Sequence, residues 1–295
     1  MNDISPDEAE IEASRAPLLD HLIELRQRLI VCVGAIILGF AICFGFSAQL
    51  YEFLLHPFSL AGQIFAAQKA GDAKGPFDLL YVLVGLKSVK AVAGATPGMI
   101  FTAPLEFFFT KLKLAGFGAV VLTFPILAWQ VYAFVAPGLY KRERHAFLPF
   151  LLAAPILFTM GAALVYYLIL PFVLWFSLSQ QIVGTTGVQV QMLPKVSDYL
   201  TLVTTLLLAF GLCFQLPVVL TLLGLARIVN SAMLWKGWRY AVLAVVVVAA
   251  IVTPPDPISQ LLLSGPIILL YFVSVGCVKL IELRRKDEEA EADAA

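Results

Sequence analysis

Charged residues are scarce in this sequence, and whole stretches have none. Asp, Glu, Lys and Arg make up 14% of the 295 residues and apolar residues 60%, whereas an ordinary soluble domain has about 25% and about 45–50%. Five charge-free stretches reach the roughly 17–25 residues that a membrane span needs. A sixth, 240–252, is short but rich in Val and Ala, which suits a thin or tilted span. The predicted spans are Leu29–Tyr51, Leu114–Tyr140, Phe147–Leu170, Leu200–Ala226, Tyr240–Val252 and Pro257–Val278.

The centres of these spans contain no Asp, Glu, Lys, Arg or His. Proton relays and ion-coupled sites normally need such a group at membrane depth, so a proton-coupled carrier is disfavoured. The sequence also has no nucleophile and base arrangement, phosphate-binding glycine loop, metal-ligand spacing or basic nucleic-acid stripe. The four cysteines all lie inside predicted spans, where we interpret them as small packing residues. We therefore expect no enzyme activity, no cofactor and no nucleic-acid partner.

Six spans place both termini on one side of the membrane. Most of the 20 Lys and Arg residues lie at the two ends of the chain, in the 141–145 turn and in the 227–239 loop, so the positive-inside rule makes both termini cytoplasmic. The acidic start lacks the basic region of a signal peptide. We expect a disordered acidic segment at 1–17, one six-span domain at 18–283 and a disordered charged tail at 284–295.

The loops on the other side are long and should form an outer cap. In the first, 52–110, the stretch Asp78–Val92 is typical of an amphipathic helix lying on the membrane surface. The second, 171–198, ends at Ser197-Asp198, a plausible helix cap. Prolines are dense in the spans and predict kinked helices around a concave wall, although the general frequency of Pro in membrane helices is the favoured explanation for any single one of them.

Two carboxylates stand beside basic residues on the predicted cytoplasmic face. Glu24 precedes Arg28 by four residues on a helix, which predicts an ion pair worth only about 0.2–0.5 kcal/mol. Glu143 lies among Lys141, Arg142 and Arg144, where the simplest reading is a topology anchor with a neutralised Glu. Together the two carboxylates could instead receive two guanidinium groups, since such pairs are charge-assisted and bidentate.

The polar exception within the spans is Gln215, followed two residues later by Pro217. A buried amide at that depth needs a partner. It could bond a neighbouring helix or the Cys213 carbonyl that Pro217 leaves free, or it could contact an inserted segment or a partner helix. The sequence leaves these alternatives open.

Five ordered motifs are shared with a known family and run across His21 to Leu283. They are His21-Leu22-x-Glu24-Leu25-Arg26-x-Arg28-Leu29, Pro104-x-Glu106-x-Phe108 with Lys113, Phe134-x-Ala136-Pro137-x-Leu139-Tyr140-x-x-Glu143-Arg144, Phe210-Gly211-x-x-Phe214-Gln215-x-Pro217, and Thr253-Pro254-Pro255-Asp256 with Gln260. The sequence resembles the TatC family, the polytopic core of the twin-arginine protein translocase. The first outer loop, about 60–95, is longer than this family leads us to expect.

The resemblance implies roles for particular residues. Glu24 and Glu143 match the two carboxylates that recognise the paired arginines of a signal peptide, and Phe134 matches an aromatic residue of the same surface. Arg26 and Arg144 belong to the same motifs and are assigned to this site.

Other matches lie deeper in the membrane or in the cap. Gln215 matches a position that is often Glu, and an amide cannot act as an ionised acceptor. Thr253 and Gln260 match a polar cluster where the single-span partners TatB and TatA are thought to dock, and Pro57 matches a proline of the outer cap.

The resemblance implies a receptor and scaffold of the bacterial inner membrane. It would bind twin-arginine signal peptides at the cytoplasmic face, recruit TatB-like and TatA-like proteins, form homo-oligomers, and export folded proteins at the expense of the proton gradient. A secondary transporter of a small molecule is the alternative, and it predicts inverted repeats and a charged or unwound midplane site. An intramembrane enzyme would need a catalytic dyad within the spans. The sequence displays neither set of features.

Overall fold

The computed structural model describes residues 6–69, 98–135, 143–181, 193–226, 228–252 and 257–293, with side chains left out at 6–21, 67, 135, 143–151, 252, 257–259 and 285–293. Within these residues, six helical stretches are long and apolar enough to cross a membrane. They confirm the prediction of an all-α protein with six spans. The predicted surface helix at Asp78–Val92 lies outside the described residues.

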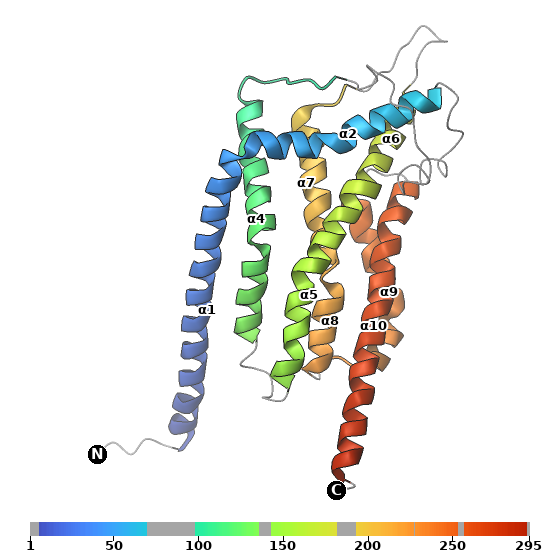
Figure 1. Cartoon of the computed structure of the whole chain (residues 1–295). Helices are drawn as coiled ribbons and strands as arrows, with labels where there is room; N and C mark the ends of the chain where they lie inside the picture. The colour runs from blue at the N-terminus through green and yellow to red at the C-terminus, as the bar shows by residue number, and fades with distance from the viewer. Residues whose placement is uncertain are drawn as a thin grey trace.

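The helices run up and down a bundle, and α1 begins at the same end of it where α10 ends (Figure 1). The third span is built from α5, the π-helical turn η2 and α6, and the fourth from α7 and α8. The elements are α1 Pro6–Gly45, α2 Ser47–Lys69, α4 Glu106–Val135, α5 Glu143–Leu164, η2 Val165–Ile169, α6 Leu170–Ser179, α7 Val196–Cys213, α8 Leu216–Leu225, α9 Ser231–Val252 and α10 Pro257–Asp293.

Helix α2 lies across the other end of the bundle (Figure 1). The first span therefore ends at Gly45 rather than at Tyr51, and α2 begins directly after it. Pro57 stands inside α2 and lacks the N–H that would bond the Phe53 carbonyl. The Tyr166 hydroxyl of η2 donates to that carbonyl at 2.7 Å. The proline thus leaves the Phe53 carbonyl free to accept a hydrogen bond that joins α2 to the third span.

The third span continues beyond Leu170, where the sequence predicts its end. Pro171 stands in the first turn of α6, directly after the π-helical turn Val165–Ile169. In that turn the N–H of Leu170 reaches back to the Val165 carbonyl. A proline is tolerated at the first turn of a helix because its missing N–H is not needed there. The helix therefore passes Pro171 and ends at Ser179, which shortens the predicted second loop.

The fourth span begins at a place that differs from the prediction, but it bends where a proline predicts. Its N-cap residue is Lys195 and makes no side-chain capping bond, so Ser197 lies inside the helix and the predicted Ser197-Asp198 cap is wrong. The span is interrupted at Phe214 and Gln215, just before Pro217 in the first turn of α8. This interruption agrees with the kink that a proline imposes on a membrane helix.

Helix α9 starts at Ser231, nine residues before the predicted span. Its first turns include Lys236 and Arg239 and carry Trp235 and Trp238, residue types that are typical of a membrane interface. At the two ends of the chain, α1 reaches back to Pro6 and α10 continues to Asp293. The structure thus has helix in parts of the two end segments that the sequence predicts to be disordered, and the proposed domain boundaries stay a prediction.

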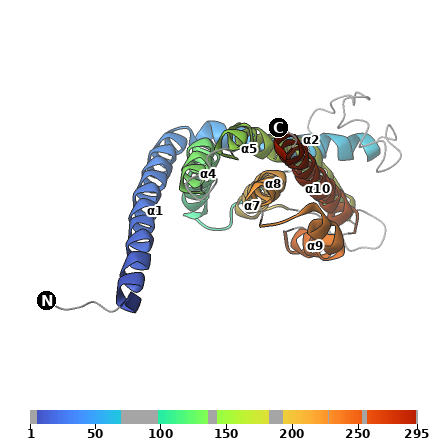
Figure 2. The ribbon, with the colours of Figure 1, turned by 90° about the horizontal axis from the view of Figure 1, so that it is seen from below.

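Close helix packing depends on glycine at two crossings. A Cβ atom on Gly211 of α7 would overlap the ring of Phe158 of α5, and one on Gly161 of α5 would lie 2.7 Å from the Phe214 ring. Small residues let membrane helices approach closely. Seen from below, α1, α4, α5 and α10 form a curved row with α7, α8 and α9 on its concave side (Figure 2). This arrangement agrees with the predicted concave wall.

Candidate functional site

Glu24 lies in α1 at the contact between α1 and α4. Its Oε1 accepts hydrogen bonds from Arg28 Nη2 at 2.5 Å and from Arg28 Nε at 3.0 Å. This confirms the ion pair that the spacing predicts. The Glu24 side chain keeps 32% of its exposure and Arg28 keeps 25%, so water and any incoming ligand can still reach the carboxylate.

A residue of α4 takes part in this arrangement. Arg28 Nη1 donates to Gln130 Oε1 at 3.4 Å, a long hydrogen bond between α1 and α4. Phe134 follows Gln130 by one helical turn and therefore lies on the same face of α4, the face turned toward α1. Its side chain is half-buried. Sequence reasoning named Phe134 but missed Gln130, whose only local signal is its position one turn before that aromatic residue.

Glu143 is the first residue of α5, and α5 begins at the end of the bundle where α4 finishes (Figure 1). A carboxylate in the first turn of a helix interacts favourably with the partial positive charge there. The side chains of Glu143 and Arg144 lie outside the described residues. Arg26, on α1, is exposed. The structure thus places Glu24 and the start of α5 on either side of the same end of α4.

Gln215 bonds a neighbouring helix. Its Nε2 donates to the Ala154 carbonyl of α5 at 2.8 Å. Of the two structural partners that the sequence allows, the structure has the neighbouring helix and not the Cys213 carbonyl. The side chain is half-buried and stands where α7 gives way to α8, so the bond fastens the bend of the fourth span to the third.

Gln260 joins the last two spans, because its Nε2 donates to the Val246 carbonyl of α9 at 3.2 Å. Thr253 lies outside the described residues. Helix α9 carries a row of exposed large side chains at helical spacing, with Tyr240 and Ile251 both 79% exposed. This row, Tyr240, Leu243, Val247 and Ile251, is called the α9 face below. Each of these side chains is at least 50% exposed, so the face is open to lipid or another helix.

At the opposite end, Glu106 caps α4. Its Oε2 accepts bonds from the backbone N–H groups of Thr102 at 2.9 Å and Ala103 at 3.2 Å, and Lys195 Nζ lies 3.6 Å away. The carboxylate thus satisfies backbone N–H groups of the segment just before α4, which is the glutamate half of a capping box, and Pro104 stands in the turn that precedes the helix. Ile100 pairs with Lys195 in an isolated β-bridge. The Glu106 motif therefore ties the segment before α4 to the segment before α7.

Among the residues that the structure describes, no three His, Cys, Asp or Glu side chains group as a metal ion would require. The four cysteines are all free and half-buried.

The family model described as "Sec-independent protein translocase protein (TatC)" matches residues 20–266. The chain belongs to the TatC family. A TatC of Magnetococcus marinus is 39% identical over 95% of this chain and 90% of its own length, and one of Rickettsia prowazekii is 35% identical over 90% and 94%.

Solved TatC structures agree in fold. The crystal structure of a twin-arginine translocase receptor TatC superposes with a TM-score of 0.66 at 28% identity, covering 88% of this chain and 98% of that one. The same receptor in dodecyl maltoside gives 0.67 at 29% identity, covering 86% and 97%. This TatC-family chain is therefore a multi-pass inner-membrane component of the protein translocase. Members of the family transport proteins and are not enzymes, so the small-molecule transporter gives way to a protein translocase component.

Proposed function

We propose that the chain is the signal-peptide receptor of its translocase and that Glu24 and Glu143 each receive one guanidinium group of a twin-arginine signal peptide. Phe134 would pack against the peptide beside them, with Arg26 and Arg144 on the rim of the site. The observation that carries this proposal is the position of Glu24. It is a partly exposed carboxylate at the α1–α4 contact, at the end of the bundle where α5 begins with Glu143.

The ion pair of Glu24 with Arg28 is weak enough to exchange. A helical i,i+4 pair with this exposure is worth about 0.2–0.5 kcal/mol, whereas a hydrogen bond to a charged group contributes about 1.5–3 kcal/mol. An incoming guanidinium would displace Arg28 at small cost. Gln130 Oε1 already contacts the Arg28 guanidinium, and it offers Arg28 an acceptor once Glu24 has changed partner.

The partner proteins have a separate place in the proposal. We assign TatB-like and TatA-like single spans to the α9 face and the adjoining Thr253 and Gln260, because the described part of α9 is little buried. Both termini would lie in the cytoplasm, which puts Glu24 where precursors arrive. The sequence has no phosphate-binding loop for nucleotide hydrolysis, so export would draw on the proton-motive force. Several copies would combine in the working complex.

Photo-crosslinking of a twin-arginine precursor to inner membranes tests the receptor assignment. We expect Glu24→Ala and Glu143→Ala to abolish the crosslink while the protein still inserts. Glu52→Ala is the matched control, since Glu52 is an exposed carboxylate on α2 at the other end of the molecule. Normal crosslinking in both site variants would refute the assignment of the two carboxylates.

A further inference from the structure

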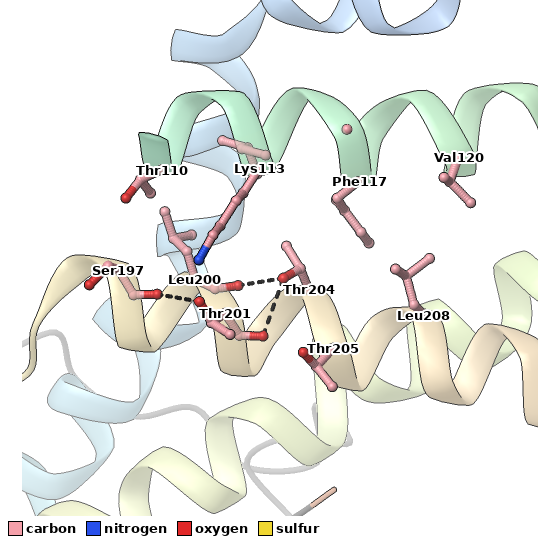
Figure 3. A pocket seen from close by; sticks show the side chains of 12 residues that line it. Thr110, Lys113, Phe117, Val120, Ser197, Leu200, Thr201, Thr204, Thr205 and Leu208 are labelled. Carbon is pink, nitrogen blue, oxygen red and sulfur yellow. Dashed lines mark hydrogen bonds between the residues drawn. The ribbon is translucent and has the colours of Figure 1, made fainter. Parts of the chain in front are cut away.

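A groove separates α4 from α7 near the end of the bundle that α2 covers. It encloses about 370 Å³, which is within the usual range of small-molecule sites. Figure 3 shows Lys113 of α4 extending across it toward α7. The lining residues are Thr110, Lys113, Leu114, Gly116, Phe117 and Val120 of α4 with Ser197, Leu200, Thr201, Thr204, Thr205 and Leu208 of α7.

The length of α4 places Lys113 near the boundary between headgroups and hydrocarbon. Helix α4 has 30 residues and is about 45 Å long, whereas the hydrocarbon layer is about 30 Å thick. If α4 is centred in the layer, about 7 Å of it projects at each side. Lys113 follows Glu106, the first residue of α4, by seven positions, or about 10 Å. Its Cα then lies about 3 Å inside the hydrocarbon, where a cation needs an anionic partner or must reach outward.

No carboxylate of the described residues pairs with Lys113. The described ion pairs join Arg28 to Glu24 and Lys195 to Glu106. Glu106, two turns before Lys113 on α4, is held by Lys195 and by backbone N–H groups. The Lys113 ammonium therefore faces the groove without a described counter-ion.

The lining changes character along the groove. Lys113 and Ser197 stand at the end near α2, whereas Phe117, Val120 and Leu208 line the end toward the middle of the membrane (Figure 3). The Thr201 and Thr204 hydroxyls donate to carbonyls of their own helix. Lys113 is therefore the cationic donor of the lining, and the apolar end of the groove suits a hydrocarbon chain.

We propose that this groove binds an anionic phospholipid from the leaflet beside α2. Its phosphate group would accept hydrogen bonds from the Lys113 ammonium, and one acyl chain would lie along Phe117, Val120 and Leu208. Charge complementarity selects an anionic lipid, because a headgroup without net charge gains less from a lone ammonium. The proposal concerns the α2 end of the molecule and does not depend on the signal-peptide site.

Native mass spectrometry of the purified full chain in detergent, given equal amounts of phosphatidylglycerol and phosphatidylcholine with the same acyl chains, tests this inference. We expect the protein to retain phosphatidylglycerol preferentially and Lys113→Gln to reduce its affinity about fivefold. Lys111→Gln is the matched control, because Lys111 lies on the same helix but over the Phe107 ring, 4.6 Å from its centroid, and does not line the groove.

A second variant fills the groove instead of removing the charge. Gly116 lines the groove, and a Cβ atom there would meet nothing within 4 Å, so Gly116→Leu should fill part of the groove and reduce lipid retention. Gly34→Leu, on α1 and equally open, should not. Equal loss of phosphatidylglycerol in Lys113→Gln and Lys111→Gln would overturn the proposal. So would unchanged retention in Gly116→Leu, or displacement of the lipid by inorganic phosphate alone.

Discussion

Replacing the two members of the Glu24–Arg28 pair should change signal-peptide affinity in opposite directions. Glu24→Gln removes the ionised acceptor, and a hydrogen bond to a charged group is worth about 1.5–3 kcal/mol. Because Glu24 keeps 32% of its exposure, we take the lower end of that range, which predicts a Kd about tenfold higher. Arg28→Gln frees Glu24 from a pair worth about 0.2–0.5 kcal/mol and should lower the Kd by about twofold at most.

The assay is equilibrium binding of a fluorescent twin-arginine peptide to the purified protein in nanodiscs. Arg28→Gln also removes a positive charge that repels a cationic peptide, so the control is Arg284→Gln, an exposed cation on α10. The Kd for Arg28→Gln should fall below that for Arg284→Gln. If Arg28→Gln weakened binding as strongly as Glu24→Gln, the ion pair would be a structural element of the surface and Glu24 would not be a free acceptor for the peptide.

Three further predictions concern the bundle. Gly211→Leu should lower the Tm by several degrees or prevent folding, because the new side chain meets the Phe158 ring. Gly237→Leu is the control and should leave the Tm unchanged, since a Cβ atom there meets nothing within 4 Å. A thermal melt in detergent compares the two variants. Tyr166→Phe should cost about 1–3 kcal/mol of stability in a denaturant titration, because the carbonyl freed by the proline of α2 loses its donor. Gln215→Leu should lower the free energy of unfolding by about 0.6–1.7 kcal/mol through its lost bond to α5 and leave the protein folded. It should also weaken co-purification of partners or signal peptide. Unchanged export and assembly would show that the amide is a packing residue.

The membrane spans could be predicted because hydrocarbon excludes charge. Each charge-free stretch overlaps one helix that can cross a membrane. The predicted ends of the spans are wrong where the sequence stays apolar across a turn or is polar inside a helix. Between Gly45 and Ser47 the chain turns without losing its apolar character, because α2 buries Leu54 and Phe58 against the bundle just as a span would. The start of α9 was predicted too late because Lys236 and Arg239 precede the charge-free stretch. Cations are tolerated at the end of a membrane helix because their side chains can reach the interface.

Prolines were informative about bends but not about helix ends. Pro217 does accompany an interruption of the fourth span, whereas Pro171 sits in a helix that continues to Ser179. The helix continues past Pro171 because a π-helical turn precedes that proline, and the local sequence pattern did not predict this turn.

The candidate site was partly predictable for a similar reason. The bond between Glu24 and Arg28 is local to one helix turn, so spacing alone indicates it. The contact of Arg28 with Gln130 joins residues that lie 102 positions apart, and it exists only because α1 packs against α4. Likewise the sequence indicated that Gln215 needs a hydrogen-bond partner, but it did not show that this partner is the Ala154 carbonyl.

A double-mutant cycle tests the central claim most directly. Glu24→Gln and Glu143→Gln are each combined with replacement of one signal-peptide arginine by glutamine, and the binding free energies of all combinations are measured in nanodiscs. If the carboxylates receive the guanidinium groups, each should couple to one arginine by about 1 kcal/mol or more, while Glu52→Gln couples to neither. Effects that add within about 0.3–0.5 kcal/mol for both carboxylates would contradict the proposed site.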